Sequence, residues 1–241
     1  RRKKQFYEEH GVTAEILDET ALQKVEPNLR DGLAGGLLVK QDSVVYQLCA
    51  TDHLIRKAKE NGAIVRTNER VTEISDDGVT LKNGERIAAG KIVNAAGAFA
   101  STLSPSLKIL KRKGHLVITD RYPGFVSHQL IELGYLKSAH GKDTDSVAFN
   151  VQPRSTGQIL LGSSRQFGSD DIEIDHKILN RMTSRAFEYM PRLRQLSAVR
   201  TWTGFRPATP DNLPYIGAIP GFKNVYAAAG HEGLGITTSL G

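Results

Sequence analysis

The chain has 241 residues and a formal net charge of +6, with 39% hydrophobic and 24% charged residues. This composition is typical of a soluble globular protein and excludes a disordered or fibrous one. No apolar run approaches the roughly 20 residues needed to cross a bilayer, so we expect no transmembrane segment. The single cysteine, Cys49, excludes an internal disulfide framework and a multi-cysteine metal site. We therefore expect the reducing cytoplasm, and we leave open an association with a membrane through an electron acceptor.

The basic excess is concentrated in two stretches, residues 108–121 and 181–206. Neither stretch interleaves aromatic stacking residues with its cations, and no helix-turn-helix, zinc-finger or RNA-binding signature is present. We therefore expect no nucleic-acid partner. Both stretches are interpreted as solvated faces or as sites for small anions. The seven histidines show no metal-ligand spacing, so no metal site is predicted.

The clearest predicted element is an amphipathic helix in which Leu48, Leu54 and Ala58 share one face and Gly62 supplies the stop. Cys49 lies in its first turn and is interpreted as a small buried hydrophobe. A strand over 63–66 follows at once, and a helix that feeds an adjacent strand is the unit of a mostly parallel sheet. The other elements predicted before residue 66 are a helix over 1–10, a strand over 12–17, a helix over 20–25 and a strand over 33–39.

Short strands predominate beyond residue 70. Asp77-Gly78 and Asn83-Gly84 are typical hairpin-turn dipeptides, which predicts a three-stranded meander around them. The predicted strands cover residues 71–74, 79–81, 86–87, 91–95, 114–119, 147–151 and 158–162. One amphipathic helix over 175–190 interrupts them.

A first candidate site follows the strand over 91–95, where the chain runs into Asn94-Ala95-Ala96-Gly97. Small side chains at the carboxyl end of a strand let a flat ligand or a phosphate approach the backbone closely. Tight packing between a strand and a helix explains the same pattern, so both interpretations stay open on these residues alone.

A second candidate is Gly204-Phe205-Arg206-Pro207, which leads into Thr209-Pro210-Asp211-Asn212. An arginine between a strand and a proline-stiffened loop suits bidentate capture of a carboxylate. A surface arginine in a basic stretch is the alternative.

A third candidate is the glycine-rich turn after an apolar strand over 225–229, which reads Gly230-His231-Glu232-Gly233-Leu234-Gly235-Ile236. We expect a helix to start there, and the exposed amide groups at such a start favour anions and electron-rich ring atoms.

In this order, the three motifs resemble those of the FAD-dependent D-amino-acid oxidase and glycine oxidase superfamily. Its members carry a strand ending in Asn-Ala-Ala-Gly, then Gly-Leu/Phe-Arg-Pro with Thr-Pro-Asp-Gly, then Ala-Ala-Gly-His ahead of a glycine-rich turn. Lys113-Gly114-His115 is similar to the family's Arg-Gly-Gln segment, and Gln152-Pro153-Arg154 is similar to one of its pocket strands. The resemblance extends from about residue 33 to residue 241.

The resemblance implies a role for each matching residue. Arg206 corresponds to the arginine that pairs with the substrate's α-carboxylate, while Ala148 and Asn150 fall on the strand that lines the substrate pocket. Val71 corresponds to the residue whose backbone meets the adenine of FAD. The cofactor-binding residues implied in this way are Val71, Ala96, Gly97, Gly230, His231, Glu232, Gly233, Leu234, Gly235 and Ile236.

The chain also departs from the family pattern. His115 replaces the usual glutamine, Asn212 replaces the usual glycine, and Gly233 stands where glycine-selective relatives place a second arginine, so substrate identity stays open. The dinucleotide fingerprint Gly-x-Gly-x-x-Gly is absent. We therefore expect an internal fragment of a longer protein, which by itself binds FAD weakly or not at all and shows no turnover.

The resemblance implies an α+β fold of the D-amino-acid-oxidase type. We expect an FAD-binding α/β part over 48–104 and 204–241, interleaved with a β-rich substrate part over 1–47 and 105–203. The implied function is oxidation of the CH–NH bond of a small amino acid or secondary amine by hydride transfer to FAD. The alternatives are a flavin dehydrogenase of a 2-hydroxy acid or polyol phosphate, and a non-catalytic partner subunit of a flavoprotein complex. A homo- or hetero-oligomer stays open.

Overall fold

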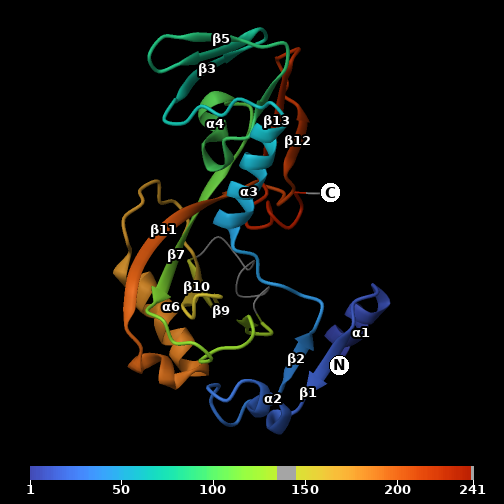
Figure 1. Ribbon diagram of the computed structural model, residues 1–241, viewed down its shortest axis with the longest axis vertical. Coiled ribbons are helices and arrows are strands. Elements are labelled where there is room, and N and C mark those ends of the chain that lie inside the picture. Colours follow the sequence, from blue (N-terminus) through green and yellow to red (C-terminus); the bar gives the residue numbers. More distant parts are fainter. Residues whose placement is uncertain (135–144, 240–241) are drawn as a thin grey trace. The chain divides into compact units, whose positions relative to one another are not determined.

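The computed structural model describes residues 1–134 and 145–239, which form two compact units (Figure 1). Each unit is built from three separate stretches of chain. Unit 1 consists of Arg1–Tyr46, Gly114–Gln166 and Ile172–Thr203, and unit 2 consists of Gln47–Lys113, Phe167–Asp171 and Gly204–Gly241. Two of the divisions fall inside strands, so that β7 (Leu110–Thr119) and β11 (Ala198–Ala208) each contribute to both units.

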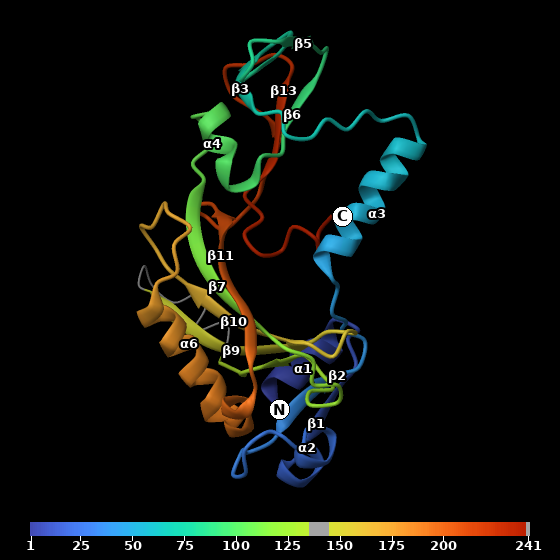
Figure 2. The same ribbon diagram turned by 60° about the vertical axis from the view of Figure 1, so that its left-hand side comes forward.

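The main sheet of unit 1 has the strand order β11-β7-β10-β9-β8. The further strands in it are β8 (Leu130–Ile131), β9 (Ser146–Pro153) and β10 (Ile159–Arg165), and helix α6 (His176–Tyr189) packs against β9 and β10 (Figure 2). Phe149 and Val151 share a core cluster with Met182 of α6. Because successive side chains of a strand point to opposite faces, Ala148 and Asn150 face away from α6.

The first 46 residues form a smaller layer of unit 1. It contains helix α1 (Arg2–Glu9), strand β1 (Ala14–Leu17), helix α2 (Glu19–Val25) and strand β2 (Gly36–Val39). Strands β1 and β2 are antiparallel. Asp18 caps α2, since its side chain accepts a hydrogen bond from the Ala21 N–H at 2.8 Å. Leu17 and Leu22 of this layer belong to the same core cluster as α6.

Unit 2 holds two three-stranded sheets. Strands β3 (Val71–Ser75), β4 (Gly78–Leu81) and β5 (Arg86–Ala88) form the meander that the two glycine dipeptides predicted. Strands β12 (Tyr215–Ala218), β13 (Val225–Ala229) and β6 (Ile92–Asn94) form the second sheet, in which β13 runs parallel to β6. A second core cluster, which includes Ile74, Ile92 and Val225, joins the two.

The mixed helix and strand content confirms the α+β class, and most predicted elements are present. Helix α3 spans Gln47–Glu60, and a 3₁₀ turn (η1, Gly97–Phe99) and helix α4 (Ala100–Leu103) follow β6. A second 3₁₀ turn, η2 (Pro191–Gln195), follows α6. Among the described residues no helix is long and apolar enough to cross a membrane.

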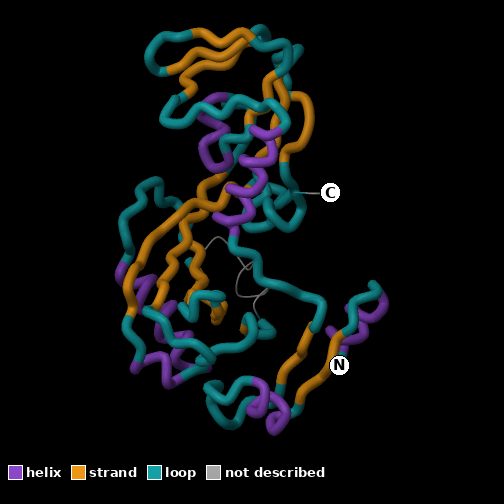
Figure 3. Tube along the Cα trace, in the orientation of Figure 1, coloured by secondary structure: helices purple, strands orange, loops and turns teal. Residues whose placement is uncertain are grey.

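Three predictions are wrong. Residues 63–66 form a loop rather than a strand, because no described strand pairs with them, and Ile64 is 89% exposed (Figure 3). Cys49 is exposed rather than buried, since α3 has no buried residue. The described segment over 231–239 forms turns instead of a regular helix, held by hydrogen bonds from the Leu234 N–H to the His231 carbonyl, from the Thr238 N–H to the Leu234 carbonyl and from the Ser239 N–H to the Ile236 carbonyl.

Candidate functional site

The candidate site of unit 2 lies where β6 and β13 end side by side. The two strands are parallel, with Tyr226 opposite Val93 and Ala227 opposite Asn94. Their carboxyl ends therefore meet at one edge of the sheet, where open α/β sheets bind their ligands. Two of the motifs singled out in the sequence, Asn94–Gly97 and the glycine-rich turn at Gly230, leave the sheet at this edge.

Asn94 holds the first of these turns in shape. Its side chain is 3% exposed, and its Nδ2 donates to the Ala100 carbonyl at 2.9 Å and to Ser104 Oγ at 3.0 Å. Its Oδ1 accepts a hydrogen bond from the Ala96 N–H at 3.2 Å. A single buried amide thus fixes both the exit of β6 and the start of α4, which explains why an asparagine rather than an apolar residue ends this strand.

Gly97, at the tip of this turn, has a φ of +55°, a conformation that side chains rarely adopt. A Cβ built on it would meet no atom within 4 Å. The backbone is therefore open to a ligand at this point.

The glycine-rich turn is held by Gly230, which has a φ of +86°. A Cβ at this position would lie 2.6 Å from the Cγ2 atom of Thr209, a residue that is fully buried. The Thr209 hydroxyl in turn donates to the Leu213 carbonyl at 2.8 Å. Both the torsion angle and the close contact require a glycine at this position. The contact with Thr209 packs the turn against the loop after β11.

Gly233 and Gly235 are in more open surroundings than Gly230. A Cβ on Gly233 would meet nothing within 4 Å, and one on Gly235 would make only ordinary contacts with the His231 side chain. Leu234 is 61% exposed, and His231 and Glu232 are partly buried. The backbone of the exposed residues 233–239 has little side-chain cover, while the Glu232 and Leu234 N–H groups already donate to carbonyls of the protein.

Arg206 is a partly buried residue of β11 in the same unit. The carbonyl of its neighbour, Pro207, accepts a hydrogen bond from the Glu232 N–H at 2.8 Å. The structure therefore brings the backbone next to the predicted carboxylate-binding arginine into contact with the predicted flavin-lining turn. Sequence spacing alone could not show this contact, since the two residues are 25 positions apart.

The loop after Arg206 explains one departure from the family pattern. Asn212, which stands where the family has glycine, has a φ of +61°. Asparagine is the non-glycine residue that best tolerates this left-handed region, so the turn keeps its shape. A hydrogen bond from the Leu213 N–H to Asp211 lowers the pKa of that carboxyl group and keeps it ionised.

The basic stretch at residues 108–121 is not a solvated face where it meets this site, which corrects the sequence interpretation. Arg112 and Glu232 form an ion pair of 3.1 Å in which each side chain is 13% exposed, and Phe167 packs against the Arg112 guanidinium. The side chain of Lys113 is 3% exposed and pairs with Asp171 at 2.7 Å. These cations are matched by acidic residues far away in the sequence.

Arg112 is a residue that the sequence analysis missed as part of the site. Its partner lies 120 positions away. The sequence offered one signal for including Arg112 in the site. Side chains alternate along a strand, so Arg112 lies on the same side of β7 as Gly114. An acid in a glycine-rich turn was a plausible partner, but the pattern could not choose among the 26 acidic residues.

Val71 begins β3 and borders a small cavity of about 170 Å³, together with Thr102 and Leu103. Ala148 and Asn150 lie on β9 of unit 1. Ala148 is 2% exposed, and the side-chain oxygen of Asn150 lies 3.5 Å from Gln152 Nε2. Val71 thus lies in the same unit as Arg206, whereas Ala148 and Asn150 lie in the other unit.

His115, the residue in place of the family glutamine, is fully buried in unit 1. Its Nε2 accepts a hydrogen bond from the Asp175 N–H, so the ring proton resides on Nδ1, which lies 3.0 Å from Ser164 Oγ. The imidazole therefore links β7, β10 and the start of α6 as a neutral structural group.

The strand edge of unit 2 suits a flavin nucleotide. Two parallel strand ends and the uncovered glycine backbone at Gly97 and Gly233 leave room for a flat ring and its phosphates. Among the described residues no group of three metal-ligating side chains gathers, so the same edge holds no candidate metal centre.

The fold is that of the flavoprotein oxidoreductases, and one of its two units holds the larger sheet. The family model for "FAD dependent oxidoreductase" (DAO) matches residues 1–241. The chain belongs to this family, whose cofactor is FAD.

Individual relatives agree with this assignment. The chain is 30% identical to the hydrogen cyanide synthase subunit HcnC of Pseudomonas protegens over 92% of its own length and 52% of the relative's. It is 27% identical to the glycine oxidase of Geobacillus kaustophilus, over 97% of the chain and 61% of the relative. The crystal structure of glycine oxidase from that organism superposes with a TM-score of 0.84 at 26% identity, covering 99% of this chain and 63% of that one. The chain thus spans about half to two thirds of the length of these relatives.

Proposed function

We propose that the whole protein oxidises the CH–NH bond of a small amino acid or secondary amine, with unit 2 as its FAD-binding part and unit 1 as its substrate part. The observation that carries this proposal is the hydrogen bond from the Glu232 N–H to the Pro207 carbonyl. It ties the strand that bears Arg206 to the turn that we assign to the flavin. A carboxylate held by Arg206 would then be fixed relative to the cofactor.

Each of the chain's own residues has a definable task in this proposal. Arg206 binds and orients the substrate carboxylate through its two parallel N–H groups. Asn94 and Gly230 shape the two turns that receive the cofactor, and Ala148 and Asn150 line the substrate pocket. When bound, FAD supplies the acceptor for the hydride that leaves the substrate's α-carbon. The protein contributes position and electrostatics, and we assign no side-chain base.

The names of the relatives favour an amine substrate. Glycine oxidase, at 27% identity, is named for an amino acid, and HcnC is named as a subunit of an enzyme. Because HcnC is named as a subunit, we also propose that the whole protein works within an oligomer. The single cysteine leads us to propose the cytoplasm as its compartment. An L-α-glycerophosphate oxidase of Mycoplasma pneumoniae solved with FAD bound, at 20% identity and a TM-score of 0.76, shares the fold alone.

The test is reduction of the flavin in the full-length protein under anaerobic conditions. The substrates to compare are glycine, sarcosine, proline, iminodiacetate and glycerol 3-phosphate. We expect bleaching of the flavin band by at least one carboxylate-bearing amine and none by the phosphate ester. Bleaching by glycerol 3-phosphate alone would favour the polyol-phosphate alternative. A flavin-loaded protein that no amine reduces would contradict the proposed function.

A further inference from the structure

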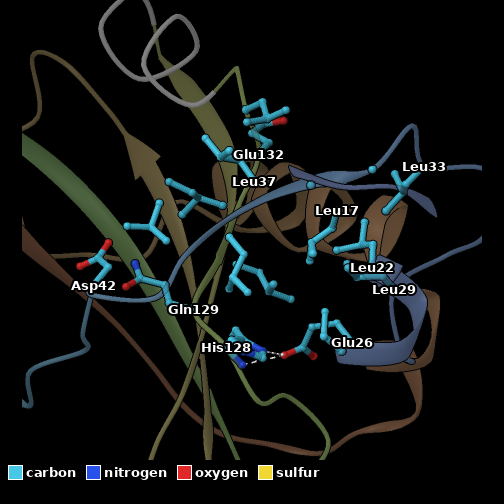
Figure 4. A pocket seen from close by; sticks show the side chains of 18 of the residues that line it. Leu17, Leu22, Glu26, Leu29, Leu33, Leu37, Asp42, His128, Gln129 and Glu132 are labelled. Atoms are coloured by element: carbon cyan, nitrogen blue, oxygen red, sulfur yellow. Dashed lines mark hydrogen bonds and ion pairs between the residues drawn. The ribbon is translucent and has the colours of Figure 1, made fainter. Parts of the chain in front are cut away.

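Unit 1 contains a cavity of about 630 Å³ (Figure 4), and its lining includes Pro153 but none of the residues to which a substrate or cofactor role was assigned above. This volume lies within the range of about 300–1,000 Å³ that is usual for small-molecule sites. The walls are mostly hydrocarbon. Their main contributors are Leu17, Leu22, Leu29, Leu33, Leu37 and Leu38.

The cavity lies on the opposite face of β9 from the predicted substrate residues. Phe149 lines it and stacks on Tyr189 of α6 with the ring centroids 4.5 Å apart. Ala148 and Asn150 alternate with Phe149 along the strand and therefore point to the other face. A ligand in the cavity would thus lie on the other side of β9 from Ala148 and Asn150.

Glu26 places a buried carboxylate in the wall of this cavity. The residue follows the last residue of α2 and precedes Pro27, which turns its backbone out of the helix. It is 1% exposed, and Figure 4 shows its side chain and that of His128 pointing toward one another. Oε1 accepts hydrogen bonds from the Ser127 N–H at 2.9 Å, the His128 N–H at 2.6 Å and His128 Nδ1 at 2.8 Å.

The second oxygen of Glu26 is different. Oε2 is buried and has no hydrogen-bond partner among the residues that the structure describes. A carboxylate oxygen withdrawn from water without a donor costs several kcal/mol, so such an atom in a cavity wall indicates a missing donor.

The other buried carboxylate of the cavity, Glu132, lacks this property. Its oxygens accept hydrogen bonds from Arg185 Nε at 3.1 Å, the Tyr189 hydroxyl at 3.1 Å and the Phe149 N–H at 3.3 Å. Both oxygens of Glu132 therefore have donors, whereas the donors to Glu26, including the His128 ring with which it makes an ion-pair contact of 2.8 Å, all engage Oε1. The open acceptor of the cavity is Oε2 of Glu26, and the ligand must bring a hydrogen-bond donor to it.

We propose that this cavity binds a small alkyl- or arylammonium ion, with the ammonium group on Glu26 Oε2 and the hydrocarbon body among the leucines. The positive charge of the ammonium group compensates the negative charge of the carboxylate. One of its N–H groups donates a hydrogen bond to Oε2. A carboxylate ligand would be repelled by Glu26, and a neutral hydrocarbon would leave Oε2 without a donor.

The experiment compares two probes of the same skeleton in the full-length holoprotein. Tert-octylammonium carries no hydrogen on the carbon next to nitrogen, so it cannot undergo CH–NH oxidation, and tert-octyl alcohol is its neutral counterpart. Methyl-labelled leucines locate the ligand by NMR, and titration gives the affinity. We expect shifts at Leu17, Leu22, Leu29 and Leu37 but not at Leu81 of unit 2, and at least about tenfold tighter binding of the ammonium.

Two variants complete the test. Glu26→Gln keeps an oxygen for the Ser127 and His128 donors but removes the charge, so it should abolish the tenfold preference. Asp42→Asn removes another carboxylate of the cavity wall and should leave the preference unchanged. Equal affinity for the two probes in the unmodified protein would overturn the proposal, even if Glu26→Gln failed to fold. Shifts confined to leucines outside the cavity would overturn it as well. Since neither probe can be a substrate, these outcomes are independent of the proposed oxidation.

Discussion

Arg206 is the residue on which the proposed substrate class depends, and its substitution gives the first prediction. In the full-length enzyme, Arg206→Ala should raise KM for a carboxylate-bearing amine and lower kcat/KM by about 2–4 kcal/mol, because a charge pair is lost. Arg206→Lys should recover only part of the lost kcat/KM, since lysine cannot form the two parallel hydrogen bonds. Steady-state kinetics on both variants provides the measurement. Unchanged kinetics in both variants would contradict the proposal that Arg206 binds the substrate carboxylate.

Two glycines of the same turn should behave in opposite ways. Gly230→Ala forces a Cβ against the buried Thr209 at a φ of +86° and should destabilise the apoprotein by about 2–4 kcal/mol. Gly233→Val adds a side chain where nothing lies within 4 Å, so it should change stability by less than about 1 kcal/mol while weakening flavin binding. Denaturant unfolding and flavin occupancy separate the two effects. Equal losses of stability and of flavin occupancy in the Gly233 variant would indicate a purely structural turn.

Single residues were predicted well where their chemistry is local. The turn preference of Asn83-Gly84 depends on neighbouring residues alone, and the hairpin formed as expected. The burial of Cys49 depends on what covers α3, which no local pattern contains, and that prediction failed. The structural role of His115 depends on Ser164 and Asp175, which are distant in the sequence.

At the scale of elements, the ion pair between Arg112 and Glu232 connects β7 to the glycine-rich turn. A double-mutant cycle with Arg112→Met and Glu232→Gln should give a coupling free energy of about 1–3 kcal/mol, because both side chains are 13% exposed. The matched control is the exposed pair Arg56 and Asp52 of α3, where the coupling should stay below about 0.5 kcal/mol. Similar values for the two pairs would contradict a specific role for Arg112.

The start of α6 gives a prediction on pH. Hydrogen bonds from the Ile178 and Lys177 N–H groups lower the pKa of Asp175, and Gln166 adds another. Because the folded pKa lies below the unfolded one, ionised Asp175 stabilises the protein at neutral pH. This contribution is lost as the pH falls below about 4, the ordinary value for aspartate, toward the lower folded pKa.

Asp175→Asn is the matched variant, because asparagine still caps a helix but does not titrate. The melting temperatures of the two proteins should differ most at neutral pH and converge in acid. A difference that stays constant from pH 7 to pH 3 would show that Asp175 does not contribute through its charge.

Whole elements were predictable when their own periodicity or turn chemistry defined them, as in α6 and the meander. The strand expected over 63–66 was not predictable, because a strand forms only through hydrogen bonds to a neighbouring strand. The apolar run Ala63, Ile64 and Val65 does not specify which strand that would be. The same limit applies to the candidate site. Its three motifs were visible in the sequence, but the parallel pairing of β6 with β13 that joins two of them was not.

For the molecule as a whole, the missing Gly-x-Gly-x-x-Gly fingerprint leads to a prediction about FAD. Dinucleotide-binding folds obtain much of their affinity from a pyrophosphate on that glycine-rich helix start. The 241 residues alone should therefore bind FAD far more weakly than a chain that also carries such a segment. Isothermal titration with FAD on both proteins measures the difference. One flavin retained per chain by the 241 residues through purification would require a phosphate site within this sequence.

Each unit takes its parts from three stretches of chain, and this has a consequence for biosynthesis. The core of unit 1 joins Leu17 and Leu22 to Met190 and Leu193. In unit 2, β6 cannot form its parallel pairing until β13 has been synthesised. At the usual pace of the ribosome, about ten to thirty seconds separate the appearance of the first and last of these core residues. During that time the early leucines lack the contacts with Met190 and Leu193 that complete their core. The nascent chain should therefore depend on holding chaperones, and a pause in translation before residue 190 should favour aggregation over folding.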